Sequence, residues 1–342
     1  SNLDEPWAKK DKLSQMMTRA NVIRVAQLGG PEMMHLVQEN LPPPGLGQVQ
    51  IRHTAIGFNY IDIYQRSGIY PLELPTGLGH EAAGIVEAIG DEVHGFAVGD
   101  RVVYMNAGIG AYASHRNLAA DKLIQLPEFL GDELAAAIFF KAMTAQYLVK
   151  KTYRVKSGDT VLIHAAAGGV GQILAAWTKS LGATVIGTVG GKAKFDAAKQ
   201  AGCDVVVDYS EANWVDQVIE ASHGKKVQVV YDSVAKDTFM GSLDCAAPFG
   251  TVVLYGAASG PAPAIAPEIL NKKGCLYLTR PSVFPHNATP QLLRENAADV
   301  MAAIQAGHIK INIGARFALS EIVSAHQLAE SRKLLGAMII TP

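Results

Sequence analysis

Residues 161–181, VLIHAAAGGVGQILAAWTKSL, join a short apolar run to an amphipathic stretch through a glycine-rich turn. The turn from Ala166 to Gly171 follows the G-x-G-x-x-G fingerprint of dinucleotide-binding folds, with alanine in place of the first glycine. Gly168 would let the backbone approach a pyrophosphate, and Gly171 would let the helix pack closely on the strand. The stretch therefore predicts a strand, a phosphate-binding turn and a helix, and a purely structural tight turn is the alternative.

The sequence that follows this turn repeats the same alternation of strand and helix. Short apolar runs recur about every 20–25 residues, with amphipathic stretches between them, as in a parallel doubly wound sheet. The predicted fold class of this part is therefore α/β. The predicted strands are Val161–His164, Val185–Thr188, Val205–Asp208, Val227–Asp232, Thr251–Tyr255 and Cys275–Thr279.

The region before the turn has a different texture. From Asn21 to about Lys141 the apolar runs are short and alternating, and Gly and Pro interrupt them, which predicts a β-rich domain of short strands. The C-terminal tail mixes both kinds of element. Its predicted elements are a helix over 289–306, a strand around Arg316, a helix over 319–334 and a strand over 337–340.

Composition excludes several classes of protein. The chain has 342 residues, enough for two domains with cores of their own, and 49% of them are hydrophobic, which excludes a disordered chain. The formal net charge of -1 provides no overall positive field, so nucleic acid is not an expected partner. No apolar run reaches the roughly 20 residues of a membrane span, so no membrane partner is expected either.

The cysteines and the N-terminus bear on the compartment and the start of the fold. Cys203, Cys245 and Cys275 are far apart and form no C-x-x-C pair, which argues against a disulfide framework and predicts reduced thiols in the cytoplasm. The Ser-Asn start is typical of a cleaved expression tag, so about the first 15 residues are excluded from the fold. The native start is expected at Met16 or Met17.

The end of the second predicted strand indicates which dinucleotide is bound. Sites specific for NAD place an acidic residue there to accept from the ribose 2′-hydroxyl, whereas this chain reads TVGGKAK over 188–194. No carboxylate would repel a 2′-phosphate, and Lys192 and Lys194 supply positive charge. The sequence therefore favours NADPH over NADH, and a solvated lysine pair at a helix start is the alternative.

With these residues placed, the chain resembles quinone oxidoreductases of the zinc-free, zeta-crystallin-like branch of the medium-chain dehydrogenase/reductase superfamily. The similarity runs from about Val22 to the C-terminus. The segments that carry it are IGFNYIDIYQRSGIYP (56–71), GLGHEAAGIVEAIG (77–90), HAAAGGVGQ (164–172), VVYDSV (229–234), SLDC (242–245), NKKGCLYLTRPS (271–282) and AESRKLLG (329–336).

The resemblance implies an architecture and an assembly. A GroES-like, β-rich catalytic domain would comprise residues 17–143 and, after a return of the chain, 283–342. A Rossmann domain at 144–282 would bind NADPH in the cleft between the two. Relatives pair the sixth strand of this sheet across a two-fold axis, which implies a homodimer.

The resemblance also implies the cofactor site. Lys194, Tyr209 and Arg332 would surround the adenosine 2′-phosphate, although Tyr209 could be only a half-buried aromatic and Arg332 only a surface cation. Glycines of the turn, polar residues of the cleft and the ends of the later strands would contact the rest of the cofactor. These positions are Asn59, Thr144, Tyr147, Gly168, Gly169, Val170, Gly171, Gly190, Ser233, Tyr255, Gly256, Leu278 and Arg280, with Tyr70 and Lys141 also lining the cleft.

Three residues are implied to take part in catalysis. Asn59, Asp62 and Tyr64 would face the nicotinamide and its ribose. Tyr64 is the best candidate for the proton donor, and water is its rival. Their structural alternative is that they are loop polar residues that cap turns.

One motif departs from the pattern expected of the resemblance. Residues 79–84, GHEAAG, match the signature of zinc alcohol dehydrogenases, in which the histidine binds catalytic zinc. A zinc site needs at least three protein ligands, and both cysteine positions lack cysteine here, around Asn59 and in 140–144. We therefore expect no metal, and we interpret His80 as a packed histidine.

The function implied is the NADPH-dependent reduction of quinones or other conjugated carbonyls by hydride transfer. Conjugation delocalises the negative charge that forms on the acceptor, so this chemistry needs no metal as a Lewis acid. One alternative is a zinc-type alcohol or aldehyde dehydrogenase. Another is a non-enzymatic, crystallin-like protein that binds NADPH and single-stranded RNA, and the lack of a basic stripe interleaved with aromatics counts against it.

Overall fold

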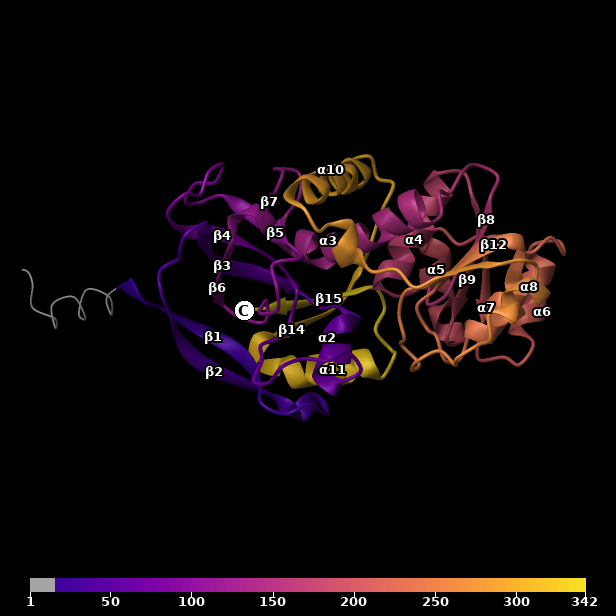
Figure 1. The fold of residues 1–342 in the computed structure, drawn as a ribbon, viewed down its shortest axis with the longest axis horizontal. Coiled ribbons are helices and arrows are strands. Elements are labelled where there is room, and N and C mark those ends of the chain that lie inside the picture. Colours follow the sequence, from indigo (N-terminus) through magenta and orange to yellow (C-terminus); the bar gives the residue numbers. More distant parts are fainter. Residues whose placement is uncertain (1–15) are drawn as a thin grey trace, which may run out of the picture. The chain divides into compact units, whose positions relative to one another are not determined.

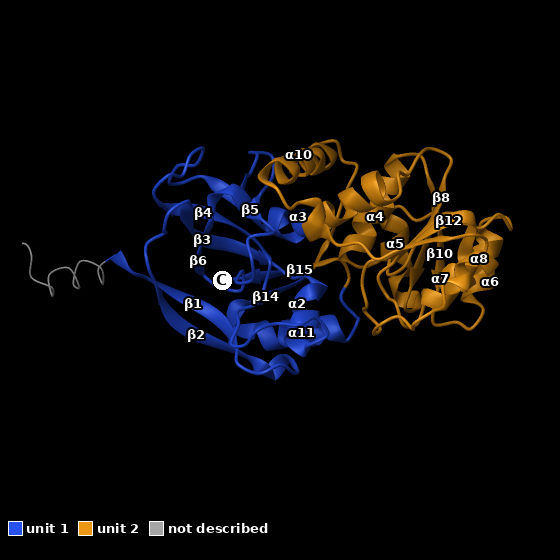
Figure 2. Ribbon diagram, viewed as in Figure 1, with its two compact units in different colours: residues 1–140, 315–334, 338–342 blue, residues 141–314, 335–337 orange. Residues whose placement is uncertain are grey.

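The computed structural model describes residues 16–342, and the chain divides into two compact units (Figure 1, Figure 2). The first unit runs to Phe140 and includes Ala315–Leu334 and Met338–Pro342. The second unit comprises Lys141–Gly314 and Leu335–Ala337. The predicted tag-derived start lies outside the described residues.

The two units differ from the predicted domains at residues 141–143, 283–314 and 335–337, all of which group with the second unit. The sequence assigns these residues to the catalytic domain. The boundaries at 143/144 and 282/283, taken as limits of domains that fold and bind on their own, stay a prediction.

The second unit is built on a six-stranded sheet in the order β10-β9-β8-β11-β12-β13, and all neighbouring strands are parallel. The strand order reverses between β8 and β11, which is where doubly wound sheets place their ligands. The predicted α/β class with a doubly wound parallel sheet is confirmed. The strands are β8 (Thr160–Ile163), β9 (Thr184–Val189), β10 (Val205–Asp208), β11 (Val227–Asp232), β12 (Ala246–Leu254) and β13 (Tyr277–Thr279).

Helices connect these strands and cover the sheet. α4 packs on β8 and β9 and beside α5, while α6 packs beside α7. The core joins Leu162, Ile186 and Val230 from strands with Trp214 and Phe239 from helices. The helices are α3 (Asp132–Tyr147), which begins in the first unit, α4 (Gly169–Ser180), α5 (Phe195–Ala201), α6 (Trp214–Ala221), α7 (Phe239–Cys245), α8 (Glu268–Lys272), α9 (Val283–His286) and α10 (Pro290–Gln305), with η3 (Leu148–Thr152) and η4 (Lys192–Lys194).

The first unit is β-rich, as the short alternating runs predict. Its larger sheet has the order β14-β15-β3-β4-β5-β7 with β6 beside β3, and β1 and β2 form a second sheet. The C-terminal strand returns to this sheet, where Ile339 pairs with Gly57. The strands are β1 (Thr18–Val25), β2 (Met34–Leu41), β3 (Gln48–Gly57), β4 (Glu81–Ile89), β5 (Arg101–Tyr104), β6 (His115–Ala119), β7 (Ile124–Gln125), β14 (Ile313–Ala318) and β15 (Ala337–Thr341).

Among the described residues of the first unit, helices α2 (Tyr60–Ser67) and α11 (Ile322–Glu330) occur besides the start of α3. Short 3₁₀ turns accompany them: η1 (Pro31–Met33), η2 (Ala120–Lys122) and η5 (Leu319–Glu321). The predicted helix over 319–334 is therefore too long, because the chain leaves the helix at Glu330 and Arg332 adopts a left-handed φ of 61°. In the described part of the chain, no helix combines the length and apolarity that crossing a membrane requires.

Candidate active site

The glycine-rich turn joins β8 to α4 in the second unit. Ala165 takes a left-handed φ of 51°, and its carbonyl accepts the Gly168 N–H at 3.0 Å, so the tight turn forms one residue before the predicted fingerprint. A Cβ at Gly171 would lie 2.1 Å from the Ala165 oxygen, so a side chain there would force the helix away from the turn. Gly169 and Val170 begin α4, and the N–H groups in the first turn of a helix have no partner within that helix and can bind an anion.

A second segment, which the sequence did not reveal, braces this turn. The Ala167 carbonyl accepts from Gln172 Nε2 at 2.9 Å and from the Gly336 N–H at 3.0 Å. Gln172 Oε1 also accepts the Asn312 N–H at 3.3 Å. Gly336 has a φ of 76°, and a Cβ there would lie 2.3 Å from the Asn312 carbonyl, so only glycine fits this approach. Hydrogen bonds from the C-terminal chain therefore help to fix the turn.

A buried hydrogen-bonded chain lies behind the turn. His164 Nδ1 contacts Thr188 Oγ1 at 2.6 Å and its Nε2 contacts Ser242 Oγ at 2.8 Å, while Ser242 donates to Asp232 Oδ2 at 2.8 Å. All four side chains are fully buried, and burial lowers the pKa of His164. Because the serine hydrogen goes to the carboxylate, Nε2–H of a neutral histidine donates to Ser242 and Nδ1 accepts from Thr188.

The residues predicted to hold the 2′-phosphate in this unit follow β9 and β10. A Cβ at Gly190 would lie 2.9 Å from the Tyr209 hydroxyl, so the structure brings this pair together and requires the small residue. Lys194 ends η4 and is half-buried. The carboxylate of Asp208 is turned to its own loop, where Oδ1 accepts from the Ser210 N–H at 2.9 Å. Asp208 therefore does not take the place of an acidic residue after β9.

The remaining predicted cofactor positions of the sheet follow β11, β12 and β13. A Cβ at Gly256 would lie 3.0 Å from the Ser233 carbonyl, so these two positions touch. Tyr255 is half-buried, and its N–H donates to the Asp232 carbonyl at 2.9 Å. Leu278 and Arg280 are exposed. All five follow or end strands at the carboxyl edge of the sheet, where ligands of such folds bind.

Two further predicted positions lie on α3. Thr144 and Tyr147 are buried, with 7% and 1% of their surface exposed. The Tyr147 ring stacks on His286, with centroids 4.4 Å apart and an angle of 13° between the planes. Tyr147 thus has a packing role in the second unit.

Asn59 and Asp62 lie together at the start of α2 in the first unit. Asp62 Oδ2 accepts the Asn59 N–H at 3.0 Å, which caps the helix. Asn59 Nδ2 donates to Glu81 Oε1 at 3.0 Å, and Glu81 Oε2 accepts the Phe140 N–H at 2.5 Å. A Cβ at Gly57 would lie 2.3 Å from Glu81 Oε1, so glycine makes room for the carboxylate. A wholly buried carboxylate therefore fixes the amide of Asn59.

Tyr64 lies one turn further along α2. It is 8% exposed, and its ring meets Tyr70 edge-on with centroids 5.2 Å apart. The Tyr70 N–H donates to the Tyr64 carbonyl at 3.0 Å, so the loop after α2 folds back on the helix. The structure thus brings the two aromatic rings of the predicted acceptor loop together, and Arg332 lies in the same unit, after α11.

Sequence reasoning missed a buried chain next to Asp62. Tyr112 Oη donates to Asp62 Oδ2 at 2.7 Å and contacts His326 Nε2 at 2.9 Å. Arg66 Nη1 donates to His326 Nδ1 at 2.6 Å. Burial lowers the pKa of His326 to about 3, with a smaller contribution from Arg66. No local motif signals this cluster, since its members come from a helix, a loop and the C-terminal region.

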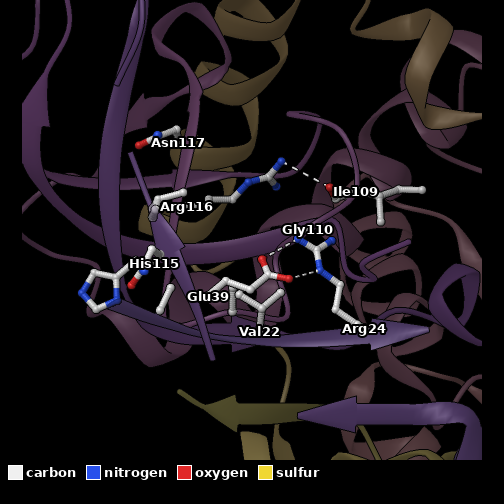
Figure 3. Close-up of a pocket in the computed structure, with 12 residues that line it drawn as sticks. Val22, Arg24, Glu39, Ile109, Gly110, His115, Arg116 and Asn117 are labelled. Atoms are coloured by element: carbon white, nitrogen blue, oxygen red, sulfur yellow. Dashed lines mark hydrogen bonds and ion pairs between the residues drawn. The ribbon is translucent and has the colours of Figure 1, made fainter. Parts of the chain in front are cut away.

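A separate pocket of about 200 Å³ opens in the first unit, where β1, β2 and β6 meet (Figure 3). Arg24 and Glu39 form a bidentate ion pair in it, with both N–O distances at 2.7 Å. Arg116 donates to the carbonyls of Gly108 and Ile109 at 3.1 and 3.4 Å. These guanidinium groups are thus engaged within the protein. None of the predicted site residues lines this pocket.

Comparison with known proteins places the chain in a family. Residues 169–297 match the zinc-binding dehydrogenase model, and residues 45–128 match the GroES-like domain of alcohol dehydrogenases. A quinone oxidoreductase of Pseudomonas aeruginosa is 45% identical over 324 residues, 94% of this chain and 100% of that protein. The chain belongs to the zinc-binding dehydrogenase family, in its quinone oxidoreductase branch. The predictions of family and of a GroES-like domain are thereby confirmed.

Other members of the family are similar over the same length. The crystal structure of an Escherichia coli quinone oxidoreductase complexed with NADPH has a TM-score of 0.92 and 42% identity, covering 94% of this chain and all of that one. A 2-haloacrylate reductase of Burkholderia sp is 41% identical, over 92% of this chain and 96% of that protein.

Because the family is named for zinc binding, we asked whether the residues around His80 could bind a zinc ion. His80 Nε2 contacts Gln65 Oε1 at 2.8 Å, and burial, with a smaller effect of Arg116, lowers its pKa to about 4. Across residues 16–342, no three or more His, Cys, Asp or Glu side chains group in a way that could hold a metal ion. The residues present therefore do not fit a catalytic zinc, which needs three protein ligands.

Proposed function

We propose that the protein is an NADPH:quinone oxidoreductase that transfers a hydride from NADPH to quinones or other conjugated carbonyls. The observation that carries the proposal is the glycine-rich turn of the second unit, where a Cβ at Gly171 would lie 2.1 Å from the Ala165 carbonyl oxygen, so that only glycine lets α4 begin this close to the turn. The family relationship supports it, since relatives alike over nearly the whole chain are quinone oxidoreductases, one of them complexed with NADPH.

The second unit would hold most of the cofactor. The N-terminus of α4, with Gly168, Gly169 and Val170, suits the pyrophosphate, because unpaired helix N–H groups and the helix dipole favour an anion. Lys194 and the phenol of Tyr209 suit the 2′-phosphate, and Arg332 of the first unit adds a guanidinium. The ends of the later strands suit the nicotinamide half, with Ser233, Tyr255, Gly256, Leu278, Arg280, Thr144 and Tyr147 as the proposed contacts.

The first unit would act on the acceptor. Bound NADPH supplies the hydride, and a conjugated acceptor spreads the resulting negative charge over its own carbonyl oxygen. Tyr64 would donate the proton that completes the reduction, with its ring packed against Tyr70 as a flat apolar wall. Asn59 would offer its amide, held by Glu81, while Asp62 holds the Asn59 backbone and positions the start of α2.

The assembly and the compartment are part of the same proposal. β13 is the edge strand of the parallel sheet, and it exposes Tyr277 and Leu278, so we propose that a second copy pairs with it in a homodimer. Cys203, Cys245 and Cys275 are free thiols, which fits the reducing cytoplasm.

The function is tested by following NADPH oxidation with three acceptors: a small quinone, an alkyl enone and an aliphatic aldehyde. We expect turnover of the quinone and the enone, slower turnover with NADH, and no loss of rate after chelator treatment. Oxidation only with the aldehyde, or activity that zinc restores after chelation, would contradict the proposal.

A further inference from the structure

Helices α2 and α11 are joined by a group of side chains that we call the α2–α11 clamp, comprising Arg66, Tyr112, His326 and Glu330. Arg66, only 1% exposed, lies at its centre. Its guanidinium donates to His326 Nδ1 and to Glu330 Oε1, each at 2.6 Å. Because the planar guanidinium of Arg66 binds two residues of α11, it fixes the orientation of α11 about its own axis relative to α2.

The hydrogen bonds of the clamp have one direction. Arginine has no acceptor atom, so Nδ1 of His326 carries the lone pair and Nε2 carries the hydrogen. Nε2–H therefore donates to Tyr112 Oη at 2.9 Å, and Tyr112 donates onward to Asp62 Oδ2 at 2.7 Å. The chain runs from Arg66 through His326 to the carboxylate that caps α2 beside Asn59.

The C-terminal end of α11 is tied to the same helix. The Ala329 carbonyl accepts from Tyr60 Oη at 3.3 Å and from the Arg332 N–H at 3.1 Å. Tyr60 is the first residue of α2, and Arg332 stands two residues beyond the clamp residue Glu330 in a left-handed conformation. The turn that presents Arg332 is therefore held on α2 both by Tyr60 and by the clamp.

From this arrangement we infer that the clamp residues add to the preference for NADPH over NADH without touching the cofactor, an inference that rests on the proposed function. α2 carries Asn59, Asp62 and Tyr64, and α11 leads to Arg332. The clamp makes the proposed phosphate contact and the proposed catalytic residues parts of one rigid element. Binding of the 2′-phosphate by Arg332 then also aligns α2, which NADH cannot achieve because it lacks that phosphate.

The test uses variants that loosen the clamp and leave every proposed cofactor contact in place. Arg66→Lys keeps the charge but loses the planar guanidinium, and Glu330→Ala cuts the clamp at its partly exposed end. Tyr60→Phe lies outside the clamp and removes the other tie between α2 and this turn, the hydrogen bond to the Ala329 carbonyl; it is grouped with the clamp variants below. Glu39→Gln is the matched control, because it weakens another Arg–Glu pair of the same unit that contacts neither helix. Each variant is first shown to be folded by its thermal melting curve.

The measured quantity is the ratio of kcat/KM with NADPH to kcat/KM with NADH. We expect each clamp variant to lower this ratio about three- to tenfold, the range for residues that couple two sites, with no change in the control. In the Arg332→Ala background the same changes should alter the ratio less than about twofold, because the coupled contact is gone.

The outcomes separate the inference from the function on which it rests. If clamp variants lower both kcat/KM values equally while Arg332→Ala lowers only the NADPH value, the clamp is merely structural and the inference is wrong. If Arg332→Ala lowers both values equally, the proposed 2′-phosphate site is wrong, and the inference falls with it. A ratio that drops as far in the Arg332→Ala background as in the wild type also overturns the coupling.

Discussion

Each unit contains a buried, neutral histidine in a hydrogen-bonded chain that ends on a buried aspartate. In the second unit His164 leads to Asp232, and in the first unit His326 leads to Asp62. The two chains differ in how far apart their members are in sequence. His164 bonds residues 24 and 78 positions away, whereas His326 bonds residues 214 and 260 positions away.

This difference corresponds to two ways of building a site. His164, Thr188 and Asp232 of the first of these hydrogen-bonded chains lie at or next to the ends of neighbouring parallel strands, and Ser242 lies on the helix after β11, so the local pattern that predicts these elements also places this chain. The support of α2 is assembled from a loop and from the C-terminal helix α11. The contacts that support α2 depend on the packing of segments distant in sequence, and no residue spacing predicts them.

The largest expected effect is a loss of stability at acid pH, because protonation of His164 and His326 would break both hydrogen-bonded chains. Burial holds the pKa of His326 at about 3 and also lowers that of His164, while both titrate near 6.5 when unfolded. The unfolded state therefore binds more protons below about pH 6.5, so the free energy of unfolding falls as pH drops, by up to about 1.4 kcal/mol per pH unit for His326, and His164 changes it in the same direction.

Denaturant unfolding from pH 7 to pH 4 checks this expectation. His326→Gln removes one titrating group and should make the pH dependence shallower by up to about 1.4 kcal/mol per unit. A slope identical to that of the wild type would mean that His326 is protonated in the folded protein.

The second effect tests the local side of the comparison. In Gly171→Val the new Cβ would lie 2.1 Å from the Ala165 carbonyl oxygen. The turn and α4 must therefore move apart. We expect NADPH to bind about a hundredfold more weakly or worse in a fluorescence titration. Gly131→Ala is the control, since a Cβ there meets nothing within 4 Å, and its affinity should match that of the wild type.

The third effect concerns the charge next to the turn. Lys194→Ala should weaken NADPH binding by about 1–3 kcal/mol, the range for a charged hydrogen bond, and barely change NADH binding. Calorimetric titration with both cofactors measures it. Equal losses for the two would remove Lys194 from the 2′-phosphate site.

The smallest effect lies on the acceptor side. Tyr64→Phe should lower kcat with a quinone by roughly tenfold or less, because water can supply the proton in place of the phenol. Steady-state rates over a range of pH check it. A loss of several thousandfold would make Tyr64 an obligatory acid, and an unchanged rate would take it out of the mechanism.

Most of the fold could be predicted from the sequence, because the βαβ alternation and the fingerprint are local patterns. The turn lies where the fingerprint predicts it, between β8 and α4, and its left-handed residue is Ala165, which no pattern in the sequence indicates. The end of α11 was missed, because nothing in the apolar pattern up to residue 334 stops a helix at Glu330.

Where the candidate site depends on residue type, as at Lys194 and Tyr209, the sequence could name the residues, and their role stays a prediction. The site was not predictable where it depends on long-range contacts. Glu81 could have been suspected from its place beside His80, but its bond to Asn59 joins the start of β4 to the residue before α2, 22 positions away in the sequence. The bracing of Ala167 by Gly336 spans an even greater length of chain.

The central claim is that this chain directs a hydride from NADPH to a conjugated carbonyl. Its most direct test is a reaction of an alkyl enone with NADPH that carries deuterium at C4 of the nicotinamide, on the face that the enzyme uses. We predict one NADPH consumed per acceptor, with the deuterium recovered at the β-carbon of the saturated ketone. Saturated ketone that carries no deuterium from either face of the nicotinamide, or no NADPH consumption, would contradict the claim.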